Sequence, residues 1–88
     1  MIPVQLAVDN AVGFAQGVLG PARTGTMLLE EVEPDTFDGK QAWKITLSLP
    51  DPDLPLTIGA NRQYKTFTVD GVTGEVLSMK IRELSSAT

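Results

Sequence analysis

The sequence predicts an α+β domain in which one N-terminal helix packs on a three- to four-stranded antiparallel sheet. Three observations predict this fold. Apolar residues recur at helical spacing over 3–19, residues 42–49 alternate strictly between apolar and polar, and residues 70–75 carry the signature of a hairpin turn. The amphipathic helix needs an apolar sheet face to cover it, and a helix laid on one face of an antiparallel sheet meets that need.

The helix is expected over residues 3–19, between Pro3, which suits a first helical turn, and the stop signal Gly20-Pro21. Gly13 and Gly17 lower its propensity, so the helix is either partly exposed or uses these glycines to admit another backbone. Leu6 and Phe14 fall outside its apolar stripe. The stripe comprises Val4, Ala7, Val8, Ala11, Val12, Ala15, Val18 and Leu19.

Four strands are expected, over 27–33, 42–49, 63–69 and 75–82, the first with a bulge. Asp38-Gly39 predicts a turn between the first two. The strict alternation of apolar and polar residues in the second strand predicts that one sheet face is buried and the other is exposed to water. The residues expected to face the core are Trp43, Ile45, Leu47 and Leu49 and, from the fourth strand, Leu77, Met79 and Ile81. Lys65, Phe67 and Val69 are expected to share one face of the third strand. Lys44, Thr46 and Ser48 are expected in water, as are Ser78, Lys80 and Arg82.

With 88 residues and 42% hydrophobic content, the chain is expected to form one domain over residues 1–84, followed by a polar tail at 85–88. The net charge of −4 argues against binding to nucleic acid or to an anionic membrane surface. No run is long enough for membrane insertion. No signal peptide is visible, which favours a cytoplasmic location, or a periplasmic or extracellular one if a leader has been cleaved.

Candidate chemistry is sparse. The chain has no cysteine and no histidine, which removes the usual nucleophiles, general bases and zinc ligands, so no catalytic residue, metal site or cofactor is assigned. Asp70 and Glu75 do not fit the spacing of a calcium loop and are read as turn residues. The acidic cluster Glu30, Glu31, Glu33, Asp35 and Asp38 is read as a solvated strand edge, with a patch for a basic partner as the alternative.

The hairpin segment also carries a family resemblance. Its run, Tyr64-Lys65-Thr66-Phe67-Thr68-Val69-Asp70-Gly71-Val72-Thr73-Gly74-Glu75-Val76-Leu77-Ser78, resembles the closing segment of PepSY domains, and the order of helix and strands is similar, with Trp43 opening the second strand. The resemblance implies a cystatin-like α+β fold and a role in binding or inhibiting peptidases, with no catalytic residues. The segment 50–61 departs from the usual form of that family.

The segment 50–61 contains three prolines and cannot continue a central strand. Its residues Leu54, Leu56 and Ile58 either fold onto the core or present an apolar surface to a protein partner. The sequence therefore predicts a non-enzymatic protein-binding module, peptidase-inhibitor-like or self-associating as a homodimer. The alternative is a small-molecule-binding domain that holds a ligand between helix and sheet, where Gly13 and Gly17 would make room. Trp43 is expected in the core, or as an interface anchor.

Overall fold

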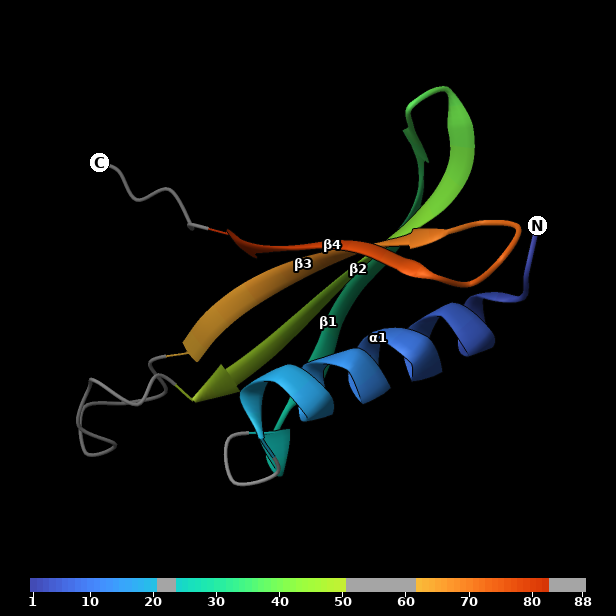
Figure 1. Ribbon diagram of the computed structural model, residues 1–88. Coiled ribbons are helices and arrows are strands. Elements are labelled where there is room, and N and C mark those ends of the chain that lie inside the picture. The colour runs from blue at the N-terminus through green and yellow to red at the C-terminus, as the bar shows by residue number, and fades with distance from the viewer. Residues whose placement is uncertain (21–23, 51–61, 83–88) are drawn as a thin grey trace, which may run out of the picture.

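The computed structural model describes residues 1–20, 24–50 and 62–82, which form a helix packed on one face of a four-stranded antiparallel sheet (Figure 1). The predicted α+β fold is thereby confirmed. The strands pair in chain order, β1-β2-β3-β4, so β1 and β4 are the sheet edges. The elements are α1 (Val4–Leu19), β1 (Leu28–Phe37), β2 (Lys40–Pro50), β3 (Arg62–Asp70) and β4 (Val76–Arg82).

The boundaries of α1 agree with the sequence signals. The helix begins after Pro3, whose carbonyl accepts the N–H of Ala7, and it ends at Gly20. Gly20 has a φ of 88°, a conformation that glycine adopts without strain, and its N–H donates to the Gln16 carbonyl. The helix is therefore stopped by local backbone chemistry as well as by its packing.

Small side chains form the contact face of α1. Ala7, Ala11 and Ala15 recur every four residues and are fully buried against the sheet. Gly13 and Gly17 lie on the exposed face, and a Cβ built on either would meet nothing within 4 Å. The expectation that these glycines admit another backbone within the fold, or make room for a ligand beneath the helix, is therefore wrong.

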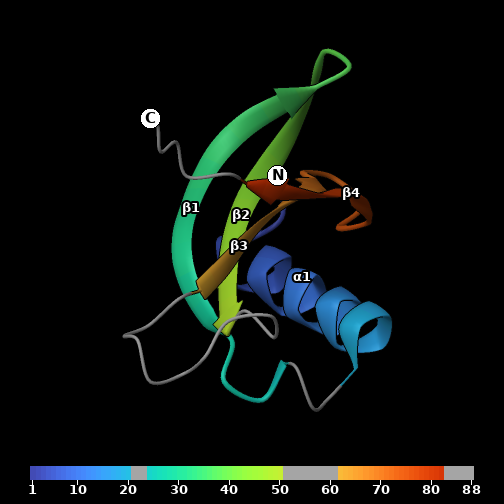
Figure 2. The same ribbon diagram turned by 90° about the vertical axis from the view of Figure 1, so that its left-hand side faces the viewer.

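The core lies between α1 and the three strands β2, β3 and β4 (Figure 2). Its buried sheet residues are Ile45 and Leu47 from β2 and Phe67 and Val69 from β3, as the alternation predicted. Trp43 is half-buried and packs against this cluster. β1 lies farthest from the helix, so its side chains contribute little to the core.

The prediction of a wet second sheet face is wrong for β2. Ala42, Thr46 and Ser48 are all buried although they alternate with the core residues. β2 is an inner strand, and these small side chains lie between longer neighbours. Thr46, for example, is paired with Glu31 on one side and Thr66 on the other. Short polar side chains on an inner strand are thus covered by the adjacent strands rather than by a second layer.

β4 also departs from the predicted pattern. A bulge in its pairing with β3 sets Val76 opposite Val69 and shifts the alternation by one residue. Val76 therefore packs against the core in place of Leu77, which is 36% exposed. Met79 packs against the core as expected, but Ile81 is 63% exposed. The assignment of Leu77 and Ile81 to the interior is wrong.

β1 is longer than predicted and continues to Phe37. The expected bulge is present, because the pairing with β2 shifts between Leu29 and Glu31. The turn at Asp38 and Gly39 is confirmed, since both residues have positive φ, 53° and 76°. Two successive positive φ angles match the right-handed twist of a two-residue hairpin, which is why Asp-Gly occurs there.

Candidate functional site

The partner-binding residues predicted from the sequence, Leu54, Leu56 and Ile58, lie outside the described residues. The candidates that follow therefore come from the sheet, its two edges and its hairpins.

The hairpin at Asp70 is a turn whose groups bond internally. One carboxylate oxygen of Asp70 accepts the backbone N–H groups of Val72 and Thr73 at 2.7 and 2.9 Å, and these bonds hold the pKa of Asp70 below its ordinary value. Gly74 has a φ of 79°, and its carbonyl accepts the side-chain amide of Asn10 on α1. The hairpin is thus fixed to the helix, as a structural element.

Gly71, the first glycine of the hairpin, is required by lack of space and not by its backbone angle. Gly71 does not adopt a positive φ; a Cβ there would lie 2.7 Å from the Gln41 carbonyl oxygen. Its N–H donates to that carbonyl, and its own carbonyl accepts the N–H of Ile2. The Trp43 indole in turn donates to the Ile2 carbonyl at 3.0 Å. This chain of bonds ties the N-terminus, β2 and the hairpin together.

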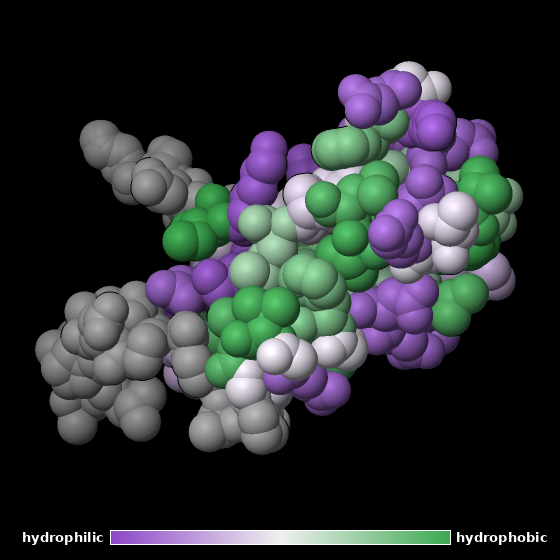
Figure 3. All heavy atoms as spheres, viewed as in Figure 1, coloured by the Kyte–Doolittle hydropathy of each residue, from purple (hydrophilic) through white to green (hydrophobic). Residues whose placement is uncertain are grey.

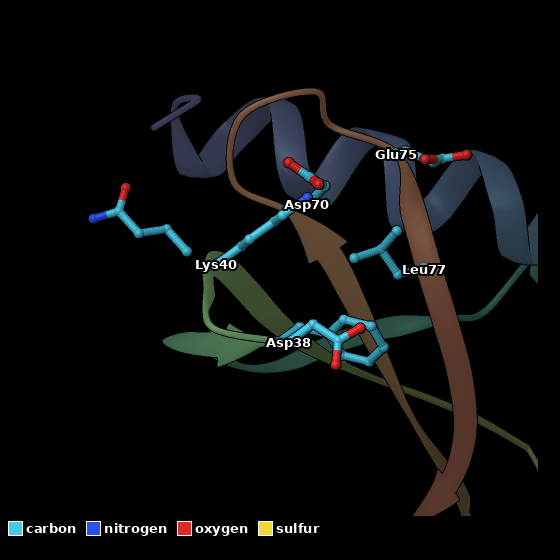
Figure 4. A pocket seen from close by; sticks show the side chains of 7 residues that line it. Asp38, Lys40, Asp70, Glu75 and Leu77 are labelled. Carbon is cyan, nitrogen blue, oxygen red and sulfur yellow. The ribbon is translucent and has the colours of Figure 1, made fainter.

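A half-open hollow of about 220 Å³ lies where the β1–β2 turn approaches the start of β4 (Figure 4). Leu77 points into it from β4, and the side chain of Asp38 lies at its opposite side. Charged side chains of both signs line it, so it lacks the apolar lining typical of small-molecule pockets. Its lining residues are Phe37, Asp38, Lys40, Gln41, Asp70, Glu75 and Leu77.

A polar network lies at the other end of the sheet. The fully buried Ser48 hydroxyl donates to the Glu30 carboxylate at 2.6 Å and accepts from Arg62 Nε at 2.8 Å. Arg62 also donates to the carbonyls of Ser48 and Thr26. Ser48 is not accessible to a substrate, and the network joins β1, β2 and β3 rather than forming a nucleophile site. Sequence reasoning missed it because Glu30 projects from the bulge.

β1 is an edge strand with several features that oppose further pairing. Four of its ten residues are acidic and none is basic, Pro34 lies in its middle, and the bulge interrupts its start. Glu33 forms an ion pair with Lys44 at 3.3 Å, with both side chains substantially exposed. Charge, proline and bulge each discourage another strand from adding to an edge. The reading of the acidic cluster as a solvated edge agrees with this placement.

β4, the opposite edge, borders an exposed apolar surface. The ring of Phe14 on α1 packs edge-on against the ring of Phe67, with the ring centroids 6.3 Å apart. Phe67 in turn pairs across the sheet with Met79 of β4. Val18 lies one turn after Phe14, and Ile81 lies two residues after Met79. Phe14, Val18 and Ile81 are 39, 55 and 63% exposed. We call Phe14, Val18, Met79 and Ile81 the β4–α1 face; apolar residues gather over this region in Figure 3.

The width of the elements explains why this face is uncovered. A helix is about 10 Å across. The outer strands of a four-stranded sheet are about 14 Å apart, and their side chains extend the sheet beyond them. One helix centred over β2 and β3 therefore leaves part of each edge strand open. On β1 the exposed residues include Leu28, Leu29 and Phe37 beside four acidic residues, and on β4 they include Ile81.

A scan against protein-family models found no match, and neither the curated proteins nor the solved structures contain a significant relative of this chain. Among residues 1–20, 24–50 and 62–82, no three Asp or Glu side chains are grouped so that they could hold a metal ion. In the same part of the chain, no helix has the length and apolarity that crossing a membrane requires.

Proposed function

We propose that this protein is a non-enzymatic binding module that accepts an extended segment of another protein chain along the edge of β4. The observation that carries the proposal is the position of the exposed β4–α1 face directly beside an edge strand. In strand addition, backbone hydrogen bonds to the edge supply affinity, and alternate side chains of the added strand contact the adjoining surface. Met79 and Ile81 line the edge, and Phe14 and Val18 extend the surface onto the helix.

The contrast between the two edges supports β4 as the binding edge. Both strands have a bulge near their start, but β1 combines acidic residues with Pro34, whereas β4 carries Lys80 and Arg82 and no acidic residue. Exposed apolar side chains on an edge strand favour pairing with another chain. β1 also exposes Leu28, Leu29 and Phe37, but its carboxylates and Pro34 oppose pairing. The proposed partner segment is therefore extended and apolar at alternate positions.

The PepSY resemblance of the hairpin segment agrees with a binding role and gives it a specific form, the binding or inhibition of a peptidase. We retain that form as part of the proposal. The small-molecule alternative is less well supported, because Ala7, Ala11 and Ala15 lie directly on the sheet where such a ligand would sit.

Selection from a displayed library of random extended peptides tests the proposal. We expect enriched peptides with alternating apolar residues whose affinity falls at least tenfold for Ile81→Lys. Leu29→Lys is the matched control, since Leu29 is 51% exposed on the other edge strand; it should leave the affinity unchanged. The proposal fails if a wild-type protein that is monomeric under the selection conditions enriches no peptide, or if the selected peptides bind the Ile81→Lys variant as well as the wild type.

A further inference from the structure

We infer that the chain added to β4 is a second copy of this protein, paired antiparallel with β4 about a two-fold axis. The inference rests on the proposed function, because it identifies the molecule that contributes the strand added to β4. It follows from the symmetry of strand pairing, the charges on the two edges and the position of the β4–α1 face.

Symmetry brings the apolar surfaces of the two copies together. An antiparallel pair of identical strands is related by a two-fold axis perpendicular to the sheet, so both helices lie on the same face of the joined sheet. Each β4–α1 face then lies beside its equivalent on the second copy. Val18 and Ile81, the most exposed members of the face, become part of a continuous apolar surface between the two helices. A self-complementary apolar patch is the usual basis of a two-fold dimer.

The charges on the edges disfavour a pair centred on Lys80 and a pair of β1 with β1. Centring the pair on Met79 sets Lys80 opposite Ser78 of the second copy, so no like charges are opposed. Centring it on Lys80 would oppose two ammonium groups, which destabilises a strand pair. Pairing β1 with β1 would oppose carboxylates, because four of its ten residues are acidic. Pairing β4 with β1 of another copy would match charges but would not close, and it would extend into a filament.

The first test is the mass of the protein in solution. Sedimentation equilibrium from about 1 µM to about 1 mM covers the affinity range of weak dimers. We expect the wild type and the Leu29→Lys control to rise from 9.4 kDa toward twice that mass, and Ile81→Lys to stay monomeric. Ile81 is largely exposed, so its substitution should leave the circular dichroism spectrum unchanged.

The second test is the register. The chain has no cysteine, so Met79→Cys introduces a single thiol. Directly opposed residues of an antiparallel pair have Cα atoms about 4.5–5.5 Å apart, within reach of a disulfide. Under mild oxidation we expect Met79→Cys to form a cross-linked dimer at least tenfold faster than Val72→Cys. Val72 is 71% exposed at the hairpin, so the Val72→Cys variant gives the rate of cross-linking by random collision alone.

A wild type that stays monomeric to about 1 mM overturns the inference, as does a Met79→Cys variant that cross-links no faster than Val72→Cys. Masses that grow past the dimer indicate pairing of β4 with β1 and also overturn it. If the protein is monomeric but selected peptides still lose affinity on Ile81→Lys, only the inference fails. If the affinity of those peptides is unchanged by Ile81→Lys, the proposed function fails as well.

Discussion

Replacing Gly71 by alanine should strongly destabilise this protein, although Gly71 needs no special backbone angle. A Cβ at this position would lie 2.7 Å from the Gln41 carbonyl oxygen and 2.9 Å from its carbon. Both are backbone atoms of β2, which cannot rotate away as a flexible side chain would. The hairpin must therefore move away from the sheet, and the bond from the Gly71 N–H to the Gln41 carbonyl lengthens.

The magnitude follows from two contributions. Overpacking of this kind costs about 1–3 kcal/mol, and a weakened hydrogen bond adds about 1 kcal/mol. The expected loss of about 2–4 kcal/mol is large against a total stability of about 4–13 kcal/mol for a chain of this length. For a domain of this size it corresponds to a fall in Tm of roughly 10–25 °C.

Urea unfolding, followed both by circular dichroism and by the fluorescence of Trp43, measures this loss. Trp43 is the only tryptophan, and its indole donates to Ile2, whose N–H donates to the Gly71 carbonyl. Gly39→Ala is the control, since Gly39 has a φ of 76° but open space around it. The free energy of unfolding of this variant should fall only by the cost of placing alanine in the left-handed region, about 1–2 kcal/mol. The reasoning is refuted if Gly71→Ala is no less stable than Gly39→Ala.

Three further predictions concern other parts of the fold. Gly13→Ala and Gly17→Ala should each raise the free energy of unfolding by about 0.5–1 kcal/mol, because both lie in open space on α1; a loss of stability in urea titrations would contradict their exposed position. Ser48→Ala should cost about 1–2 kcal/mol, because it removes bonds to two charged side chains, and an unchanged unfolding midpoint would show that the network is not stabilising. The lowered pKa of Asp70 contributes stability that is present above its unfolded pKa of about 3.9 and is lost as pH falls through the folded value. Asp70→Asn should therefore be less stable than the wild type at pH 7 (as measured by thermal unfolding), and the two should converge only as pH falls below the lowered folded pKa of Asp70; a difference that does not shrink as pH falls from 7 into the acid range would contradict the carboxylate's role.

The fold could be predicted because its signals are local. The helix end at Gly20, the turn at Asp38 and Gly39, and the alternation of β2 each depend on a few neighbouring residues. That Val76 rather than Leu77 packs against the core could not be predicted, because the bulge that brings Val76 inward depends on pairing with β3. The burial of Ser48 was missed for a similar reason, since Glu30 and Arg62 reach it from other strands.

The sequence by itself determined the element types, their order and the absence of cysteine and histidine, because these follow from composition and from spacing along the chain. Only the tertiary structure decided which glycine needs positive φ and which needs space, since Gly71 is constrained by Gln41, thirty positions earlier. The tertiary structure also decided where the candidate binding surface lies. Strand order makes β4 an edge, and the limited width of α1 leaves Ile81 uncovered. Both depend on distances between elements that no local pattern records.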